Sequence, residues 1–232
     1  VIVVVRHISK IILPRPSAVF LRLYEDAGYF FIENGLITFY EALTGFVIAA
    51  VVAIALAAFM ARSRLFERMV FPLAIVLKAT PIVVIAPLLV IWMGYSTGPK
   101  IVMAALLCFF PILVNTITGL RSVNPTALEF FQSLAASEGE IFLHLRRQYA
   151  LPYVLAAFKT ATSLSVIGAV VAEWAGAGQG LGRVVFLKAA SLDQTAVLAG
   201  VFVLALMGIL MTAAVNWLEK RLLYWHESVI VG

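Results

Sequence analysis

The feature that most constrains this chain is a series of long segments that contain no charged residue. Four of them lie at 42–61, 79–99, 101–120 and 194–218, and a fifth, at 148–172, is interrupted by a single lysine. A helix of about 20 residues, rising about 1.5 Å per residue, crosses a hydrocarbon core of about 30 Å. In lipid only helices or closed barrels satisfy the backbone, and these segments are too long and too uniformly apolar for barrel strands. The sequence therefore predicts an all-α polytopic membrane protein.

Composition supports a lipid environment and excludes several soluble classes. Hydrophobic residues make up 63% of the 232 residues and charged residues 12%, against about 45–50% and about 25% in ordinary soluble domains. The net charge of +5 does not indicate nucleic-acid binding, because Lys and Arg lie between the apolar segments, as loop anchors do. The single cysteine, Cys108, lies inside an apolar segment, so we interpret it as a core residue and expect no disulfide framework.

The apolar segments divide the chain into predicted spans and connecting segments. Residues 1–5 are too few to cross a bilayer, so we interpret them as the end of a first helix, which would make six spans. Residues 14–35 are mixed and aromatic, which favours a short interfacial helix that starts at Pro16-Ser17. The other spans are predicted at about 37–60, 71–93, 100–120, 148–172 and 194–218. The span at 71–93 contains three prolines, which would bend it.

One polar and amphipathic segment, residues 124–148, interrupts this pattern. Asn124-Pro125 is typical of a helix start, and Leu128, Phe131 and Leu134 then recur at helical spacing as one apolar stripe. The distribution of Lys and Arg favours the cytoplasmic side for this segment.

A second short helix is predicted within the same segment. Ser137 and Glu140 have the spacing of a capping box, and the stripe that follows consists of Ile141, Phe142 and Leu145. The small residues Ala135-Ala136-Ser137 would form the bend between the two helices. Such a helix–turn–helix is too apolar on one face for water, so we expect it to dock on a partner. The alternative is a helix pair that lies on the bilayer surface.

This segment resembles the EAA loop of binding-protein-dependent ABC importer permeases. In that comparison Glu129 falls on the acidic position, Ala135 on the glycine and Leu145 on the isoleucine, while Arg147-Gln148 replaces the leucine–proline. A second leucine–proline, typical of the nitrate/sulfonate/taurine branch, is intact in ALPY at 150–153. The stretches LPRPSAV, EALTGF, ATPIVVIAPLLVIWMGYS, FFPILVNTITGLRSVNP and AEWAGAGQGLG also look like this branch. Within it, the chain is most similar to permeases for thiamine pyrimidine precursors or riboflavin.

The resemblance implies a fold and a set of partners. The fold would be the six-helix type I ABC importer permease architecture, with residues 1–232 forming a single transmembrane domain in a bacterial cytoplasmic (inner) membrane. The partners would be ABC ATPase subunits that bind ATP and Mg²⁺, a second copy of the permease and an extracytoplasmic substrate-binding protein. This chain would bind no cofactor and would not be an enzyme. Sulfonate, taurine or nitrate-type anions are the alternative solutes, and an ion-coupled secondary transporter is the rival class.

The resemblance also assigns roles to particular residues. The residues that would couple to the ATPase are Glu129, Phe131, Leu134, Ala135, Ala136, Ser137, Glu140, Phe142 and Leu145. Since alanine replaces the loop glycine, we expect position 135 to avoid a left-handed backbone. We also expect the second helix to end near Arg147.

A few polar or kinked positions in or near the spans are candidates for the path or its gate. They are Glu41, Pro81, Lys159, Glu173 and Trp174. An interfacial location, where water reaches the side chain, is the alternative for Glu41 and the favoured interpretation for Glu173. For Lys159 we favour a side chain that extends to the interface.

Other motifs point to no catalytic chemistry. The glycine-rich stretch at 176–182 follows a span and has the wrong spacing for a nucleotide loop, so we interpret 173–193 as a mobile external loop near the exit of the path. The three histidines have no metal-ligating neighbours at useful spacing, and no metal site is predicted. No set of residues suited to nucleophilic catalysis gathers in one segment.

Overall fold

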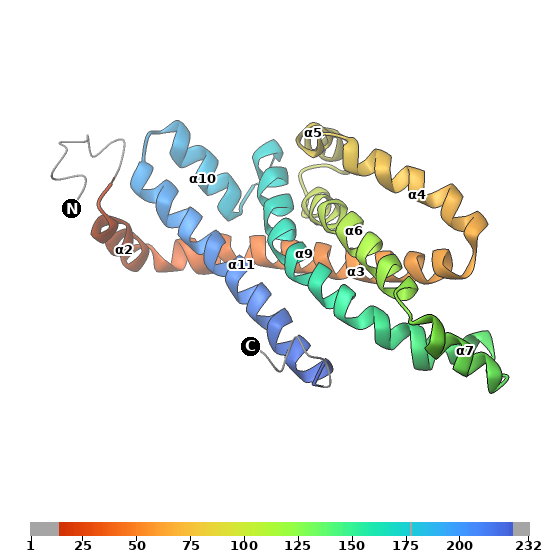
Figure 1. Ribbon diagram of the computed structural model, residues 1–232. Coiled ribbons are helices and arrows are strands. Elements are labelled where there is room, and N and C mark those ends of the chain that lie inside the picture. Colours follow the sequence, from red (N-terminus) through yellow and green to blue (C-terminus); the bar gives the residue numbers. More distant parts are fainter. Residues whose placement is uncertain (1–13, 177, 225–232) are drawn as a thin grey trace, which may run out of the picture. The chain divides into compact units, whose positions relative to one another are not determined.

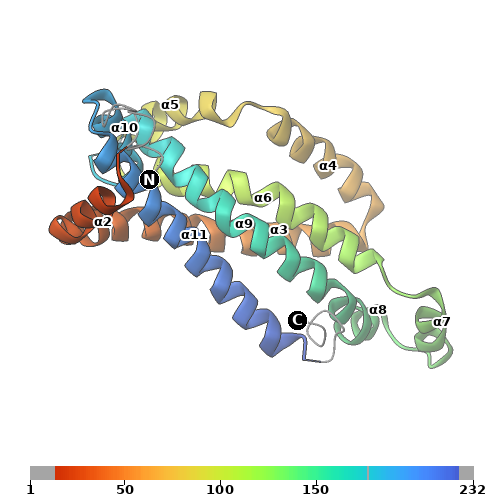
Figure 2. The same cartoon turned by 60° about the vertical axis from the view of Figure 1, so that its left-hand side comes forward.

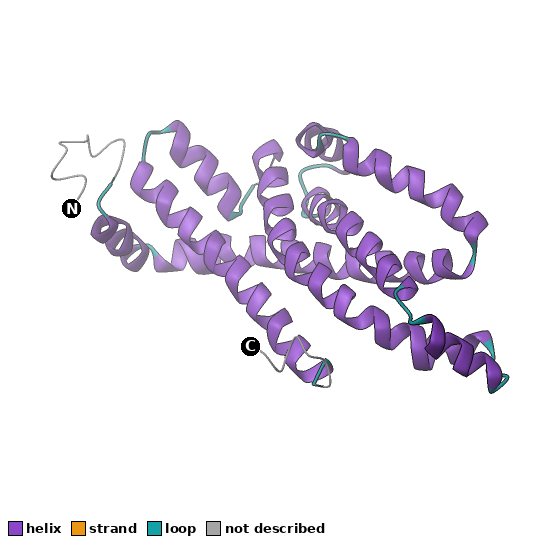
Figure 3. Ribbon diagram, viewed as in Figure 1, coloured by secondary structure: helices purple, strands orange, loops and turns teal. Residues whose placement is uncertain are grey.

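The structure is a computed structural model that describes residues 14–176 and 178–224. Within these residues the chain is helical and contains no strand (Figure 3). In chain order the elements are α2 (Pro16–Glu25), η1 (Gly28–Gly35), α3 (Leu36–Arg62), α4 (Arg64–Ala79), α5 (Ile82–Met93), α6 (Gly98–Arg121), α7 (Pro125–Ser133), α8 (Glu138–Glu140), η2 (Ile141–Arg146), α9 (Arg147–Gly176), α10 (Leu181–Ala190) and α11 (Gln194–Leu222). The elements η1 and η2 are π-helical turns.

Four helical stretches of the described chain are long and apolar enough to cross a membrane. They are Gly28–Arg62, Gly98–Arg121, Glu138–Gly176 and Gln194–Leu222. These confirm the predicted spans at about 37–60, 100–120, 148–172 and 194–218. The first predicted helix, at Val1 to Val5, lies outside the described residues.

The span predicted as one bent helix at 71–93 is instead two helices, so that prediction was wrong. Ser63 begins α4 by accepting a hydrogen bond from the Phe66 N–H at 3.3 Å. The helix ends at Ala79, and the next residue, Thr80, has an extended backbone (ψ 129°). Proline disfavours the helical conformation in the residue before it, so Pro81 terminates α4, and α5 then begins at Ile82.

Two connecting segments also differ from expectation. Helix α2 has proline at its first turn, as Pro16-Ser17 predicted, but residues 28–35 continue into the long apolar helix α3 and so belong with a span. The predicted external loop at 173–193 contains the short helix α10, which the sequence analysis did not foresee. Glycine and a helix of fewer than three turns gave too little periodicity to reveal it.

The chain divides into two compact units, each with its own core. Unit 1 comprises Val1–Gly45, Ile82–Ala104 and Ser165–Leu210. Its apolar cluster joins Leu23 of α2 and Phe30 of η1 with residues of α10 and the first half of α11. Figure 1 shows α10 running beside the start of α11. The cluster includes Leu181, Val184, Ala196, Ala199 and Val203, all buried.

Unit 2 comprises Phe46–Pro81, Ala105–Leu164 and Met211–Gly232, and its core is rich in small residues. Ala53, Ala57 and Ala161 are fully buried there, together with Cys108, as predicted for that cysteine. The Cys108 thiol donates to the Ala161 carbonyl at 3.1 Å. A Cβ atom on Gly119 would lie 2.8 Å from the Ala150 Cα, so α6 and α9 approach closely because this position is glycine.

Candidate functional site

The amphipathic segment forms the predicted helix pair, and its first helix begins as expected. The Asn124 side chain accepts a hydrogen bond from the Thr126 N–H at 2.9 Å, and Pro125 occupies the first helical position. Together they satisfy or remove backbone donors that a helix start leaves unpaired. Helix α7 then runs to Ser133.

The end of α7 corrects the expectation for position 135. Ala135 has a left-handed backbone (φ 51°). The Ala135 N–H donates to the Gln132 carbonyl at 3.0 Å and the Ala136 N–H donates to the Phe131 carbonyl at 3.1 Å. These two bonds are a Schellman motif, which satisfies the last carbonyls of a helix. The motif places alanine where glycine fits better, at a steric cost of about 1–2 kcal/mol.

The second helix starts as predicted but does not end where expected. The Ser137 hydroxyl accepts from the Glu140 N–H at 3.3 Å, and the Glu140 carboxylate accepts from the Ser137 N–H at 2.8 Å. This reciprocal pair is the predicted capping box. Beyond Arg147 the helix continues without a break into α9 as far as Gly176. The π-helical turn Ile141–Arg146 connects α8 to α9, and the helix continues even though Pro152 lies inside α9.

The predicted coupling residues divide into exposed and buried groups. Three large apolar side chains are exposed: Leu134 (64%) and Phe130 (60%) near the end of α7, and Leu143 (50%) on η2. The polar members Glu129, Ser137 and Glu140 are also exposed, whereas Phe131, Ala136 and Phe142 are half-buried. Leu145 is only 6% exposed, so its side chain packs inside the chain. Figure 2 shows α7 beside α8, and α7 contacts η2. The large apolar side chains that the helix pair exposes are therefore Phe130, Leu134 and Leu143.

A second site, in unit 1, is a buried cluster of polar side chains around Glu173. Glu173 at the end of α9 is 1% exposed. Its carboxylate accepts from the Thr38 hydroxyl at 2.6 Å and from the Gly182 N–H at 2.5 Å, with the Arg183 N–H at 3.4 Å. The interfacial, water-exposed location expected for Glu173 was therefore wrong, because the segment that follows folds back over it.

The same cluster caps the start of α10 from other elements. The first N–H groups of a helix have no partner within the helix. Here the Gly180 N–H donates to the Asn34 side chain at 3.0 Å, and the Leu181 N–H donates to the Thr38 hydroxyl at 2.9 Å. Glu173 accepts the next two N–H groups, and a carboxylate at this position also complements the helix dipole. We call Asn34, Thr38 and Glu173 the α10 cap.

The glycines of the sequence AGAGQGLG serve this approach of backbone to carboxylate. Gly180 has a φ of 121°, which side chains rarely adopt, and a Cβ atom there would lie 2.3 Å from the Glu173 Oε1. A Cβ atom on Gly182 would lie 2.7 Å from the Glu173 Oε2. The stretch predicted as a mobile loop is thus held by hydrogen bonds from Gly180 onwards.

Two further ionisable groups lie next to the α10 cap. Glu41 is 1% exposed and its carboxyl group faces Glu173, while its Oε2 atom has no hydrogen-bond partner among the described residues. Lys100 is 3% exposed, donates to the Ser96 carbonyl at 2.5 Å and attracts Glu41 electrostatically. Burial of charges is costly unless they are paired, so these groups depend on one another.

No sequence motif marked Asn34, Thr38 and Lys100 as site residues. Positions 34, 38 and 41 recur at four- and three-residue spacing, which places three polar side chains on one face of η1 and α3. That spacing next to an apolar run was the available signal. Only the tertiary structure shows that this face meets Glu173.

The remaining path and gate candidates have local partners. Lys159 pairs with Glu219 at 2.5 Å within unit 2. The Trp174 indole N–H donates to the Gly182 carbonyl at 2.9 Å, beside the α10 cap. Pro81 lies at the break between α4 and α5. Among the described residues, no group of three or more His, Cys, Asp and Glu could hold a metal ion.

An ion pair in unit 2 joins the start of α4 to the end of α6. Arg121 donates to both Glu67 oxygens, at 2.8 and 2.5 Å. The hydrogen-bonded guanidinium holds the pKa of Glu67 below its ordinary value. Such a fork is geometrically specific even where solvent weakens it.

The fold has a counterpart among solved structures. A chain in the crystal structure of an amino acid ABC transporter with histidines matches it with a TM-score of 0.69, over 87% of this chain and 98% of that chain, at 14% identity. At the level of sequence, residues 49–224 match the family described as binding-protein-dependent transport system inner membrane component. The chain belongs to this family, and it is the permease subunit of a binding-protein-dependent ABC importer of the bacterial inner membrane.

Curated relatives share most of the chain's length. The formylaminopyrimidine transport permease protein ThiX of Halalkalibacterium halodurans is 35% identical over 94% of this chain and 87% of its own. The riboflavin transport system permease protein RibX of Chloroflexus aurantiacus is 29% identical over 94% of this chain and 81% of its own. The putative aliphatic sulfonates transport permease protein SsuC of Bacillus subtilis is 29% identical over 95% and 80%. These matches agree with the branch that the sequence motifs indicated.

Replacing Ala135 by glycine should stabilise the turn of the helix pair. Glycine removes the steric cost of the left-handed backbone, which we expect to be worth about 1 kcal/mol. Hydrogen exchange followed by mass spectrometry should show slower exchange of the amides at 135–137. Ala127→Gly, inside α7, is the matched control. It should have the opposite effect and speed the exchange of the α7 amides by a similar factor, since glycine disfavours a helix interior. Faster exchange in both variants would contradict a steric cost at Ala135.

Replacing Glu173 by glutamine should loosen the start of α10. The variant loses the charge that strengthens the bonds to the Thr38 hydroxyl and the two backbone amides, each worth about 1.5–3 kcal/mol when charge-assisted. Amides at 180–184 should exchange about tenfold faster or more, with little change in unit 2. Glu33→Gln, an exposed position on η1, is the control. Unchanged exchange at 180–184 would show that Glu173 does not cap α10.

Proposed function

We propose that this chain forms the path by which a small organic solute crosses the membrane. We also propose that a separate ATPase drives this transport by acting on the helix pair. The observation that carries the coupling role is the exposure of Phe130, Leu134 and Leu143 on a pair of helices that are each capped at the start. Large apolar side chains on a segment this polar favour burial against a partner surface. Membership of the importer family supports an ABC ATPase as that partner.

The proposed mechanism divides binding, energy and passage among different chains. ATP and Mg²⁺ would bind to the ATPase subunits, whose closure would pull on α7 and, through the unbroken helix from Glu138 to Gly176, on the end of α9. The helix is continuous over these residues, although Pro152 inside α9 removes one of its backbone hydrogen bonds. A second copy of the permease would complete the path, and a substrate-binding protein would deliver the solute on the opposite side.

The Glu173 end of α9 is the proposed external gate. Helix α9 ends where Glu173 caps α10, so a movement of α9 would act on the start of α10 through these hydrogen bonds. Glu41, Glu173 and Trp174 would therefore act by holding the external segment, because Glu41 and Glu173 are buried and do not face an open path. Lys159 and Pro81 are proposed to support α9 and the break between α4 and α5.

For the solute, we propose a thiamine pyrimidine precursor or a riboflavin-like compound. The support is the 35% identity to the formylaminopyrimidine permease over 94% of the chain, with the riboflavin permease at 29%. The aliphatic sulfonate permease, at 29% over a similar length, represents the alternative.

The ATPase-docking role predicts the effect of a single charge on the helix pair. Leu134→Asp should abolish co-purification of the ATPase with this chain in mild detergent, because a carboxylate would be desolvated in the contact. Leu192→Asp is the matched control, a leucine of similar exposure (67%) in the turn before α11, and it should leave the association intact. Mass spectrometry of the co-purified subunits measures both. Normal association of the Leu134→Asp variant would exclude Leu134 from the contact.

The solute proposal is tested on the substrate-binding protein that accompanies this chain. We expect formylaminopyrimidine or riboflavin, and not taurine or an aliphatic sulfonate, to raise its melting temperature and to bind by calorimetry. A ligand present at 100 times its Kd stabilises by about 2.7 kcal/mol, a shift that is readily measured. Stabilisation by a sulfonate alone would favour the alternative, while leaving the importer class unaffected.

A further inference from the structure

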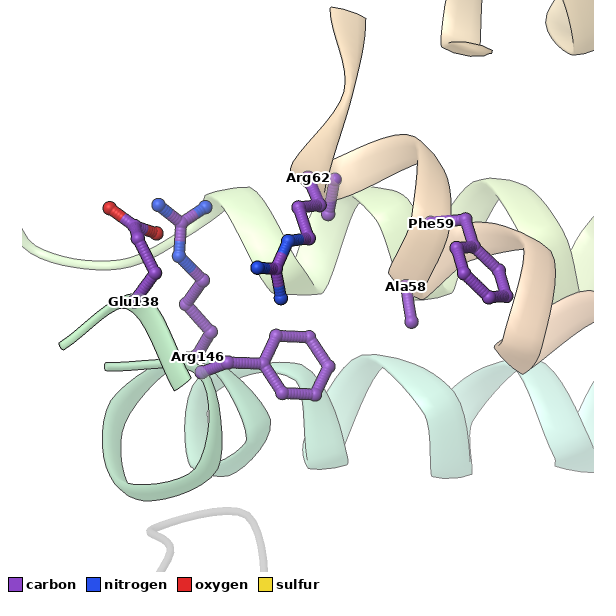
Figure 4. Close-up of a pocket in the computed structure, with 7 residues that line it drawn as sticks. Ala58, Phe59, Arg62, Glu138 and Arg146 are labelled. Carbon is purple, nitrogen blue, oxygen red and sulfur yellow. The ribbon is translucent and has the colours of Figure 1, made fainter. Parts of the chain in front are cut away.

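A pocket of unit 2 combines two arginines with an apolar wall. It has a volume of about 190 Å³ and lies where the C-terminal end of α3 faces α8 and η2. Figure 4 shows the Arg62 and Arg146 side chains reaching into it from two different helices, with Glu138 beside Arg146. The wall is formed by Ala58, Phe59 and Phe142.

The two guanidinium groups are not neutralised within the described chain. Neither Arg62 nor Arg146 forms a salt bridge with a described residue, whereas Arg121 in the same unit is paired with Glu67. With one carboxylate, Glu138, in the lining, the pocket keeps a net charge of about +1. Two planar, multidentate donors facing one space suit a phosphate group.

An exposed apolar stripe on α3 leads into this pocket. Ile48, Val52, Ala55 and Phe59 are all exposed and recur every three or four residues, and the next position of that series is Arg62. The opposite face of the helix, at Ala49, Ala53 and Ala57, is buried in the core of unit 2. The stripe lies within an apolar run that ends at Arg62. In a bilayer spanned by this run, the stripe would lie at acyl-chain depth and the pocket at headgroup depth.

We propose that this pocket binds the phosphate group of an anionic phospholipid, with one acyl chain lying along the stripe of α3. The pocket is smaller than the roughly 300 Å³ or more of sites that enclose whole organic ligands, which suits a headgroup better than a transported solute. Basic pockets between membrane helices bind anionic headgroups in this way. The apolar wall favours a lipid over free phosphate, since free phosphate would gain nothing from Phe59.

The lipid preference of the whole purified chain tests the proposal. The chain, purified in mild detergent with its accompanying subunits and then delipidated, is titrated with phosphatidylglycerol and with phosphatidylcholine and followed by native mass spectrometry. We expect the first phosphatidylglycerol to bind at least tenfold more tightly than phosphatidylcholine, about fivefold or less arising from each arginine. The double variant Arg62→Gln/Arg146→Gln should remove this preference.

The matched control removes the same amount of charge at neighbouring positions of the chain. The variant Arg64→Gln/Arg147→Gln also removes two arginines, each within two residues of a pocket arginine, but neither lines the pocket. It should keep most of the preference. The variant Glu138→Gln should strengthen phosphatidylglycerol binding, because it removes the one negative charge of the lining. Unchanged melting curves show that the variants are folded.

Three results would overturn the proposal. One is an equal loss of preference in the two double variants, which would indicate a general effect of surface charge. Another is displacement of phosphatidylglycerol by millimolar inorganic phosphate, which would indicate a site for the free anion. The third is an unchanged lipid preference together with loss of dimer in Arg62→Gln/Arg146→Gln, which would assign this face to a second copy of the chain.

Discussion

The first N–H groups and the last C=O groups of a helix have no partner within that helix, so each helix end needs a partner from another part of the protein or from water. Most features of this structure follow from that constraint. The chain closes its helix ends with side chains: Asn124 at α7, Ser137 and Glu140 at α8, and Ser63 at α4. The start of α10 is the unusual case, because its partners come from η1, α3 and α9. Glycines at 180 and 182 let the backbone there lie close to the Glu173 carboxylate.

Charges obey the same constraint. Lys159 is paired with Glu219, and Glu67 with Arg121, so these side chains need no role in transport to explain their presence. Glu41, Glu173 and Lys100 are instead buried together near a helix end that a carboxylate stabilises. The cluster holds the start of α10 in place, because a movement of that backbone would break its hydrogen bonds to Thr38 and Glu173. It is therefore suited to a segment that must be rigid in one state of a transporter and released in another.

The helix pair was largely predictable because its signals are local. The caps at Asn124 and Ser137 involve residues two and three positions away, so spacing alone revealed them. The left-handed Ala135 was not predictable, since the residue type argued against it and the two Schellman hydrogen bonds outweigh its steric cost. The break before Pro81 was also misjudged: three prolines in one apolar run indicate strain, but not which one ends a helix.

The sequence by itself determined that this chain is helical, spans a membrane and carries one amphipathic helix pair. These three features depend on the length of the apolar segments, on hydrophobic periodicity and on capping by nearby residues. Its motifs also indicated the importer family. Only the tertiary structure decided which polar residues meet: that Glu173 is buried over α10 and that Leu145 faces inwards while Leu134 faces outwards. It also decided that Arg62 and Arg146 share a pocket. Such pairings join residues far apart in the chain, and no local pattern encodes the packing that brings them together.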